Sequence, residues 1–311
     1  MKNKINNSLL CGLILASTLL AACNGTSNSS GNQTNTMTIN PSLSGLAYDQ
    51  VSKSVYSVDQ SGTLCQLAVQ NIPGNMVCNL TPPNNILIAS QVVSDNQGNI
   101  YALGSEATTD NNFILKYNTQ DNTWAINSID IPFVMSYSKL LYRQNKLYIS
   151  DPNLATLYTI NLASNSLESV PNFFMPAPGV IEDFDQNGNL YYSYQLDTES
   201  NFQTITTTQV YITPLSGSST SAAPFGSANN NINDLVYVKN TAYACAESSF
   251  LYLPSGSGAS SSWQVLTNSS QPDYFSCDYV TTDGRNLYYV EGQWTSEENY
   301  SNNYVGMMAI N

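Results

Sequence analysis

A short unit of apolar residues around a tyrosine recurs along the chain and constrains the fold more than any other feature of the sequence. The unit occurs six times, at steps of 43 to 52 residues, with its tyrosine at Tyr56, Tyr101, Tyr148, Tyr191, Tyr243 and Tyr288. Each copy is preceded by an apolar run that ends in Asp, Asn, Gln or Gly, and it is followed by further short apolar runs. A repeat of this length indicates one supersecondary unit per copy.

The residues around each tyrosine have the composition of β-strands joined by tight turns. Val, Ile, Leu and Tyr gather in short runs, and Asn, Asp, Gly and Ser separate these runs. No stretch after residue 40 shows a sustained helical period. Four short antiparallel strands in each of six copies predict an all-β fold, the six-bladed β-propeller, with seven blades as the alternative. In such a ring, we expect the repeated tyrosines to pack between blades.

The last copy, which ends in NNYVGMMAIN, is one strand short of a full blade. The segment TMTIN at residues 36–40 has strand composition and lies just before the first copy. We therefore expect this N-terminal strand to complete the last blade and close the ring, because a propeller protects its strands by closure. The propeller domain then spans residues 36–311.

The first residues follow the pattern of an export signal. Two lysines precede an apolar run at residues 9–20, which is too short to span a bilayer as a permanent helix. The Leu-Ala-Ala-Cys sequence after it resembles the lipobox of bacterial lipoproteins, with an ordinary secretory peptide as the alternative. The resemblance implies a signal peptide at 1–22 and a lipid such as palmitate on Cys23. Residues 23–35 are a flexible tether. We expect an exported protein whose lipid anchor is its only membrane contact, at the outer membrane, on the periplasmic face or the cell surface.

The repeated units also resemble a known group of propellers. The stretches DQNGNLYYSY (185–194), DNQGNIYALG (95–104) and QNKLYISD (144–151) are similar to the strand-turn-strand core of NHL-like and gluconolactonase-like six-bladed β-propellers. In two of these stretches, acidic and amide residues surround Gly98 or Gly188, a spacing that a calcium loop also uses. A helix-flanked calcium loop needs ligands at alternating positions and a closing glutamate, which neither copy supplies. We therefore predict tight turns here, with glycine providing a positive φ.

Charge and composition exclude several classes of function. The formal net charge is −13, and an acidic protein repels nucleic acid, so we expect no nucleic-acid partner. The chain contains no histidine, which excludes Ser/His/Asp and Cys/His nucleophilic systems and most zinc, copper and iron sites. The sequence also lacks a glycine-rich phosphate loop.

Four cysteines remain in the expected domain, an even number in an oxidising compartment. We expect Cys65 to pair with Cys78 across a short hairpin, and Cys245 to pair with Cys277 between neighbouring repeats. Four cysteines allow three pairings, so the other two stay open.

Acidic residues that enter the inner strands are the candidates for chemistry, because propellers place ligands at the mouth of the central channel. These candidate channel ligands are Glu182, Asp183, Asp234 and Asp278. Converging carboxylates would form an all-oxygen site for calcium or another divalent cation, which could activate water. Gluconolactonase-like enzymes use a comparable set, but their Glu-Gly-Pro motif is missing, since Asp-Phe follows Glu182. The alternative is that these carboxylates cap strand ends and that no cofactor binds.

Two long polar segments, 196–209 and 293–303, are expected to be loops on one face of the ring. Trp294, Tyr300 and Tyr304 lie in or beside the second segment and are our candidates for a contact surface. We expect a protein or ligand-binding module that is not an enzyme, recognising a protein, a small molecule or a glycan. The alternatives are a metal-dependent hydrolase of a lactone or similar small ester, and a carbohydrate-binding surface protein. The fold alone does not choose among them.

Overall fold

The computed structural model covers the whole chain. It describes residues 42–106, 109, 111–133, 138–151, 155–171, 173, 175, 179–200, 203–215, 223–228, 231–246, 249–254, 261–266, 275–296 and 299–310. The expected signal peptide, the tether with Cys23 and the strand at 36–40 lie outside the described residues, so these predictions stay predictions.

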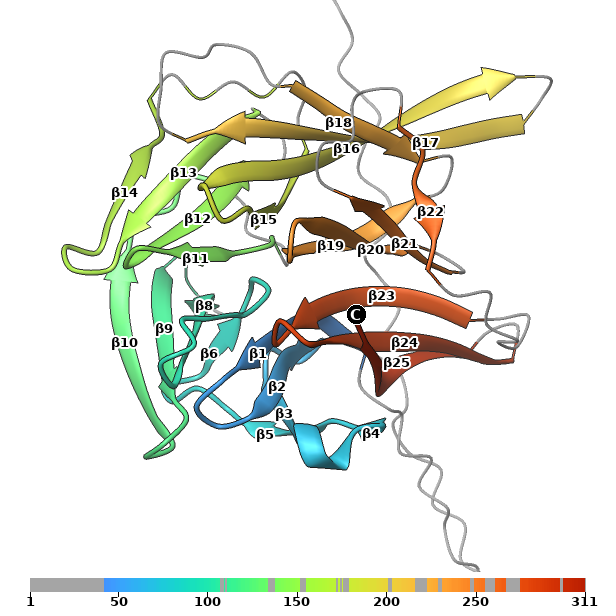
Figure 1. Cartoon of the computed structure of the whole chain (residues 1–311). Helices are drawn as coiled ribbons and strands as arrows, with labels where there is room; N and C mark the ends of the chain where they lie inside the picture. Colours follow the sequence, from blue (N-terminus) through green and yellow to red (C-terminus); the bar gives the residue numbers. More distant parts are fainter. Residues whose placement is uncertain are drawn as a thin grey trace, which may run out of the picture. The chain divides into compact units, whose positions relative to one another are not determined.

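Six antiparallel sheets follow one another around a ring, and each is one blade of a six-bladed β-propeller (Figure 1). Blade 1 contains β1 (Leu43–Asp49), β2 (Ser54–Asp59), β3 (Leu64–Ala68) and β5 (Val77–Leu80). Blade 2 contains β6 (Ile86–Ile88) and β7 (Val93–Ser94), which both pair with β8 (Asn99–Glu106), followed by β9 (Asn112–Asn118) and β10 (Thr123–Ile129). Blade 3 contains β11 (Leu141–Arg143), β12 (Lys146–Asp151), β13 (Thr156–Asn161) and β14 (Ser166–Ser169).

The second half of the chain builds the other three blades. Blade 4 contains β15 (Val180–Phe184), β16 (Asn189–Ser200), β17 (Gln203–Pro214) and β18 (Ala223–Ala228). Blade 5 contains β19 (Ile232–Val238), β20 (Thr241–Ala246), β21 (Ser249–Pro254) and β22 (Gln264–Val265). Blade 6 contains β23 (Phe275–Thr282), β24 (Asn286–Ser296), β25 (Asn299–Ala309) and β4 (Gly74–Asn75). The prediction of six four-stranded blades is therefore confirmed, with the inner strand of blade 2 divided into β6 and β7, and seven blades are excluded.

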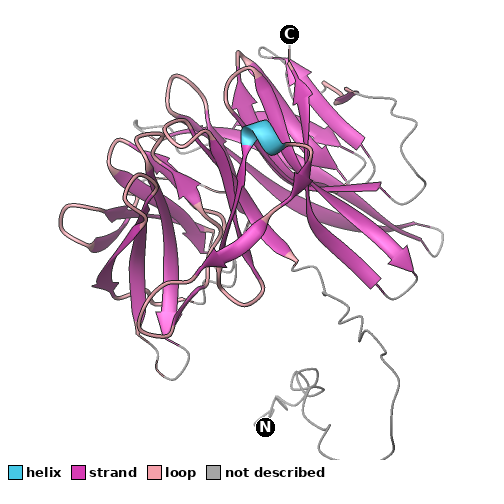
Figure 2. Ribbon diagram, turned by 90° about the horizontal axis from the view of Figure 1, so that it is seen from below, coloured by secondary structure: helices cyan, strands magenta, loops and turns pink. Residues whose placement is uncertain are grey.

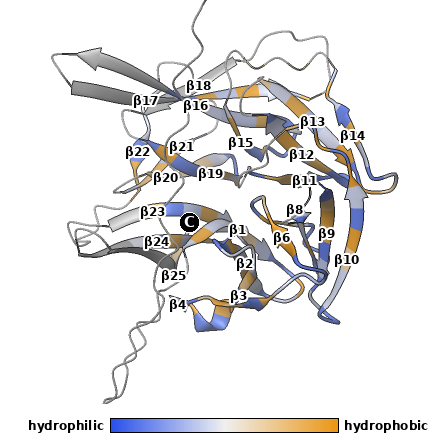
Figure 3. Cartoon of the chain, turned by 180° about the vertical axis from the view of Figure 1, so that it is seen from behind, coloured by the Kyte–Doolittle hydropathy of each residue, from blue (hydrophilic) through white to orange (hydrophobic). Residues whose placement is uncertain are grey.

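Helical structure is nearly absent from the described part of the chain. Its one helical segment is a 3₁₀ turn, η1 (Val69–Asn71), drawn in cyan in Figure 2. Within the same residues, no helix is long and apolar enough to cross a membrane. Apolar positions are spread over the described strands of all the blades (Figure 3). The stabilising burial is therefore divided among the interfaces between blades.

The six repeated tyrosines occupy these interfaces, as the sequence predicted. Each belongs to a different apolar cluster, and each cluster joins two neighbouring blades, including the last and the first. Their exposed fractions range from 0% to 8%. A buried aromatic side chain is among the largest apolar contributions that a residue makes. One tyrosine per interface is therefore the repeated packing element of the ring.

The Asp-Asn-Gln-Gly stretches form tight turns, as predicted. Gly98 and Gly188 have φ angles of +94° and +86°, in the region that favours glycine. The Asp95 carboxylate accepts hydrogen bonds from the backbone N–H of Gln97 and Asn99 and from the Asn99 side chain. Asp185 makes the corresponding contacts in the second copy. These carboxylates satisfy the amides of their own turns.

Both predicted disulfides are present. Cys65 and Cys78 are joined across β3 and β5 of blade 1. Cys245 of β20 and Cys277 of β23 are joined between blades 5 and 6. The first bridge therefore lies within one blade, and the second links two neighbouring repeats.

The two long segments that we expected to be loops are strands instead. Residues 196–200 continue β16 and residues 203–209 continue β17, with Leu196 opposite Thr207. Likewise, β24 runs to Ser296 and β25 begins at Asn299. The expectation of loops was wrong because runs such as TITTTQ are rich in β-branched residues, which extend a hairpin beyond the blade.

Candidate functional site

The inner strands of blades 4, 5 and 6 each contain one extra residue, a β-bulge. In β15 the register shifts between Ile181 and Asp183, so that Glu182 is the extra residue. Corresponding shifts in β19 and β23 make Asn233 and Asp278 the extra residues. A bulge bends its strand and redirects a side chain, and bulges are frequent beside functional sites.

All three bulge residues line one cavity. Its volume is about 570 Å³, within the range for small-molecule sites. The other residues that line it come from blades 4, 5 and 6: Gly179, Val180, Ser193, Tyr194, Gln195, Ile232 and Tyr279. Asn233 and Gln195 are exposed, and Val180 is 47% exposed although it is apolar. The cavity is thus open, and it combines polar groups with two tyrosines.

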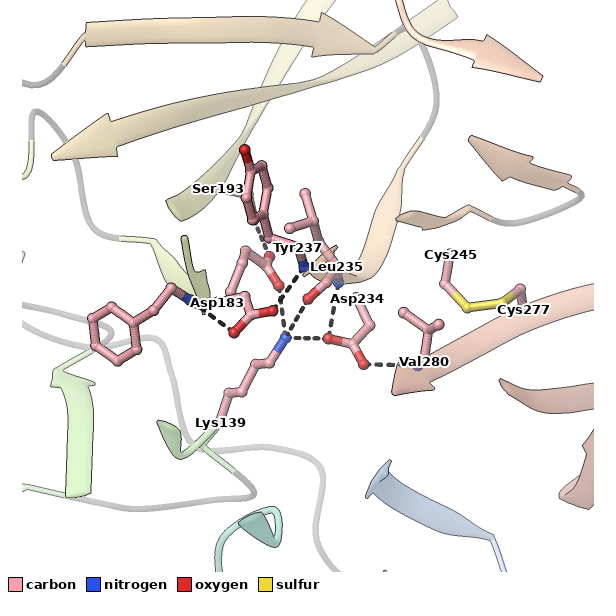
Figure 4. A network of polar contacts seen from close by, with 11 residues as sticks. Lys139, Asp183, Ser193, Asp234, Leu235, Tyr237, Cys245, Cys277 and Val280 are labelled. Carbon is pink, nitrogen blue, oxygen red and sulfur yellow. Dashed lines mark hydrogen bonds and ion pairs between the residues drawn. A yellow bond between two sulfur atoms is a disulfide. The ribbon is translucent and has the colours of Figure 1, made fainter. Parts of the chain in front are cut away.

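A buried ion-pair network, drawn in Figure 4, adjoins this cavity through Glu182. Lys139 precedes β11, its side chain is 11% exposed, and its Nζ donates to Glu182 Oε2 at 3.0 Å. The same ammonium pairs with Asp234 Oδ1 and donates to the carbonyl oxygen of Leu235 at 3.1 Å. The other oxygen of Glu182 accepts a hydrogen bond from Ser193. One lysine therefore connects blades 3, 4 and 5 near the ring centre.

Burial and charge together set the protonation of this network. Burial would lower the pKa of the Lys139 ammonium, but Asp234 and Glu182 outweigh it and hold that pKa above its usual value. Burial raises the pKa of Glu182 to about 7, against the lowering effect of Lys139. Burial also raises the pKa of Asp183 to about 6, against the backbone N–H of Tyr237. The lysine is thus charged at neutral pH, and the carboxyl group of Glu182 titrates close to neutral pH.

Two of the predicted channel ligands also connect blades through backbone amides. Asp183 accepts hydrogen bonds from the N–H of Tyr237 in blade 5 and of Phe184, both at 2.7 Å. Asp234 accepts one from the N–H of Val280 in blade 6 at 2.8 Å. Each carboxylate satisfies a donor that would otherwise be buried without a partner. The amides of Tyr237 and Val280 lie within the neighbouring inner strands, so the alternative that these groups cap strand ends stays a prediction.

The four predicted acidic residues therefore occupy two different settings. Glu182, Asp183 and Asp234 surround the Lys139 ammonium or adjoin it, whereas Asp278 lies in the cavity wall. Among the described residues, the one set of three Asp, Glu or Cys side chains with ligand atoms within 4.8 Å of one another is Asp59 with the disulfide-bonded Cys65 and Cys78. Disulfide sulfurs do not offer the thiolate that a metal requires. The geometry thus centres on an ammonium ion.

Sequence reasoning missed Lys139, which is central to the site. A signal was present, because Lys139 stands just before the apolar run of an inner strand, in the kind of place where the acidic candidates were sought. A second cavity, of about 230 Å³, is lined by the inner strands of all the blades. Lys139 and Asp183 line only this smaller cavity, whereas Glu182 borders both. The ion pair therefore lies between the two cavities.

The two extended hairpins lie on the cavity side of the ring. Val180, the first residue of β15, pairs with Ser193 of β16. The residues of β16 after Ser193 therefore extend past the start of this inner strand. In blade 6, Phe275 at the start of β23 pairs with Gln293. Both hairpins extend to the right in Figure 1. The prediction that both segments emerge on one face thus agrees with the strand register.

The aromatic candidates for a contact surface lie along the hairpin of blade 6. The register places Trp294 opposite Tyr300, near the tip, and Tyr304 opposite Glu291, nearer the ring. Tyr304 also pairs with Asn75 of β4 and is half-buried. Tyr304 is thus part of the closure of blade 6. The contact role of all three residues stays a prediction.

Comparison with known proteins supports the fold. No protein-family model matches the chain, and no curated protein matches its sequence. A protein assigned as a glucose dehydrogenase from Thermus thermophilus is similar in structure, with 10% identity, a TM-score of 0.55, and coverage of 87% of this chain and 98% of that one. A protein assigned as a gluconolactonase has 13% identity and a TM-score of 0.54, with 88% and 91% covered. The WD40 repeats of RRP9 have 13% identity and a TM-score of 0.55, with 91% and 96% covered. At these identities the likeness establishes the propeller fold alone.

Proposed function

We propose that this protein is an exported binding module that holds a small polar ligand in the cavity between blades 4, 5 and 6. The observation that carries the proposal is the convergence of three inner-strand bulges on one cavity, where Glu182, Asn233 and Asp278 form part of its wall. Open concave sites with a few converging polar groups are the usual form of small-molecule sites.

The lining favours a ligand that donates hydrogen bonds. Glu182 and Asp278 contribute carboxylates, Asn233 and Gln195 contribute amides, and no Lys or Arg of the described residues is in the lining. A phosphate or carboxylate ligand would meet repulsion there, since carboxylates accept hydrogen bonds and carry the same charge. A polyol, a sugar or an amine offers the matching donors. This keeps our carbohydrate-binding alternative within the proposed class.

Binding suits the site better than metal-dependent hydrolysis. Glu182 and Asp234, which a divalent ion would need, already share the ammonium of Lys139. An incoming metal ion would have to displace a tethered cation and leave it buried beside another positive charge, which is unfavourable at short range. We propose that Lys139 is the resident cation of the ring centre. The gluconolactonase-like alternative requires a metal ion to bind despite it.

Export and lipid anchoring belong to the same proposal. Their support is the signal-like segment, the lipobox-like sequence before Cys23, and the two disulfides, which persist in oxidising compartments. Metabolic labelling with an alkyne analogue of palmitate tests the anchor. We expect the label on the full chain and its loss from Cys23→Ser. Equal labelling of that variant would contradict the lipid assignment.

The ligand test is a thermal-shift screen of the soluble body, residues 24–311, against matched sets of sugars, polyols, amines, phosphates and carboxylates. We expect a rise in Tm with members of the first three sets and none with the anions, because a ligand that binds only the folded state stabilises it. Asp278→Asn and Asn233→Ala should abolish the shift, and Asp130→Asn, at an exposed position just after β10, should preserve it. A shift that all three variants retain would exclude this cavity.

The same assay separates binding from metal chemistry. In EDTA and then in excess calcium, magnesium or manganese, the unmodified protein should show no metal-dependent rise in Tm. Lys139→Ala frees the oxygens of Glu182 and Asp234 and should gain such a rise if the protein folds. A clear metal-dependent rise in the unmodified protein would overturn the assignment of Lys139 as the resident cation and favour the hydrolase.

A further inference from the structure

The outer strand of the last blade comes from the first blade. The two residues of β4 pair with β25, with Gly74 opposite Val305 and Asn75 opposite Tyr304. They lie between β3 and β5 of blade 1, in the segment between Cys65 and Cys78. Part of the closure of the ring therefore runs through a loop that a disulfide bounds.

This loop also packs into the interface that it closes. Ile72 and Met76, which flank β4, are 8% and 5% exposed. They belong to the apolar cluster that contains Val290 and Val305 of blade 6 and Leu67 of blade 1. The loop thus contributes side chains as well as a strand to the contact between the first and last blades.

The disulfide fixes the two ends of the loop. Cys65 in β3 lies directly opposite Cys78 in β5, and these strands share a short register that runs only from Leu64 to Gln66 on the β3 side. A cross-link restricts the conformations of the chain that it encloses. Without the disulfide, only the short edge strand β5 would hold the C-terminal end of the loop that contains β4.

The two disulfides differ in their access to solvent. Cys65 is buried, but Cys78 is half-buried. Cys245 and Cys277 are both 0% exposed. Thiol–disulfide exchange begins with attack by a thiolate on an accessible sulfur, so the Cys65–Cys78 bridge is the one that a soluble reductant reaches in the folded protein.

We propose that the loop between Cys65 and Cys78 is a redox-sensitive clasp that holds the outer edge of the ring closed. A dithiol reductant attacks Cys78 Sγ, forms a mixed disulfide and releases the Cys65 thiolate, which takes up a proton. The second thiol of the reductant then resolves the mixed disulfide and releases Cys78 as a thiol. Two electrons pass to the protein, and the reductant leaves as its own disulfide. Release of the loop frees β4 from β25.

The inner part of the same interface does not depend on this loop. The Tyr48 ring stacks on the Tyr288 ring with centroids 5.5 Å apart, and the Tyr48 N–H donates to Thr281 Oγ1 at 3.2 Å. These contacts join β1 to blade 6 near the axis. Reduction should therefore open the outer edge locally and leave the ring folded.

The test is graded reduction of the folded protein with dithiothreitol, followed by alkylation, mass spectrometry and amide hydrogen exchange. We expect Cys65 and Cys78 to become alkylated at a lower reductant concentration than Cys245 and Cys277. Exchange in a peptide covering 299–310 should then accelerate at least tenfold, while blade 3 stays unchanged. Reduction of Cys245–Cys277 first, or faster exchange throughout the chain, would overturn the proposal.

Two variants separate the strand from the disulfide. Asn75→Pro removes a backbone donor from β4 and leaves both cysteines in place. It should reproduce the faster exchange in 299–310 without any reductant, with the Cys65–Cys78 bridge intact. The Cys65→Ser/Cys78→Ser double variant should show the same local change, and Cys245→Ser/Cys277→Ser is its matched control. If the double variant fails to fold, the clasp is refuted as a local device. Unchanged exchange in Asn75→Pro would show that β4 does not hold the edge.

Discussion

The inner strands of blade 1 and of blades 4 to 6 carry the same kind of bulge, but they use it differently. In blade 1, Gly45 and Leu46 together lie opposite the single residue Ser57, and a side chain at Gly45 would meet Gln91 Cβ at 2.6 Å. The side chain of Gln91 therefore occupies the space beside that bulge. In blades 4 to 6 the bulges carry polar side chains that line an open cavity. The comparison shows that one repeated backbone feature can either fill a packing contact or line a cavity, depending on the residue placed in it.

Blade 1 and blades 4 to 6 also differ in the partners of their buried carboxylates. Asp49 is 0% exposed and accepts hydrogen bonds from the N–H groups of Ser52 and Gly98 and from the hydroxyls of Ser94 and Thr119. Asp234 is 3% exposed and is paired with a full positive charge. Neutral dipoles and a charged partner both compensate for the burial of a carboxylate. Removal of the charged partner, however, leaves the charge of the carboxylate unpaired in the interior.

Lys139→Met should have the largest effect, because it leaves Glu182 and Asp234 buried without their cation. We expect a loss of about 3–5 kcal/mol in the free energy of unfolding, measured by urea denaturation at pH 8. Adding Glu182→Gln and Asp234→Asn should recover part of that loss. A decrease below about 1 kcal/mol would show that the carboxylates find other partners.

Asp49→Ala tests the buried carboxylate that neutral hydrogen-bond donors compensate. Several donors from blades 1 and 2 lose their acceptor, and a buried donor without a partner costs about 1–3 kcal/mol. We expect a loss of that size by urea denaturation, smaller than that of Lys139→Met. If Asp49→Ala were the more damaging variant, the distinction between charged and neutral compensation would fail.

Gly45→Ala and Gly284→Ala form a matched pair for the filled bulge. Both glycines have positive φ, at +74° and +84°, but a side chain at Gly284 would meet nothing within 4 Å. The backbone penalty should cost each variant about 1 kcal/mol, and the contact with Gln91 should add about 1 kcal/mol more for Gly45 alone. Equal losses in thermal or urea unfolding would mean that Gln91 moves aside freely.

The acidic network also makes the stability of the fold depend on pH. The pKa of Glu182 is raised to about 7 and that of Asp183 to about 6 in the folded state, against ordinary pKa values of 4.5 and 3.8. Between these values the folded state binds more protons than the unfolded state, so stability falls as pH rises from about 4 to 7. Together, these two shifts should make the free energy of unfolding about 4 kcal/mol higher at pH 5 than at pH 8. Glu182→Gln should flatten this slope, and a steeper rise with pH would contradict it.

The sequence was sufficient for the repeated parts of the structure. Six tyrosines at regular steps predicted the six blade interfaces, and the four cysteines predicted both disulfides. These features depend on local pattern, which a sequence displays directly. Lys139 was missed because its partners lie 43 and 95 residues away, in blades 4 and 5. A long-range ion pair leaves no periodic signal.

The cavity itself was beyond sequence reasoning for a related reason. Glu182 and Asp278 were recognised as candidates, and Asn233 stood in a similar position, but nothing local showed that all three are bulge residues. A bulge depends on the pairing register of two strands, and so on where the next strand begins. The segments 196–209 and 293–303 were misjudged because polar composition alone does not separate a loop from an extended hairpin.

The extended hairpins of blades 4 and 6 also affect how such a protein can change over generations. Beyond Ser193 and Gln293, β16 and β24 no longer pair with the inner strands of their blades. Insertions, deletions and substitutions near the hairpin tips therefore leave the inner blade register undisturbed, and the tyrosine interfaces keep their geometry. A lineage can diversify the rim beside the cavity while the ring stays constant, much as antibody loops vary on a fixed framework.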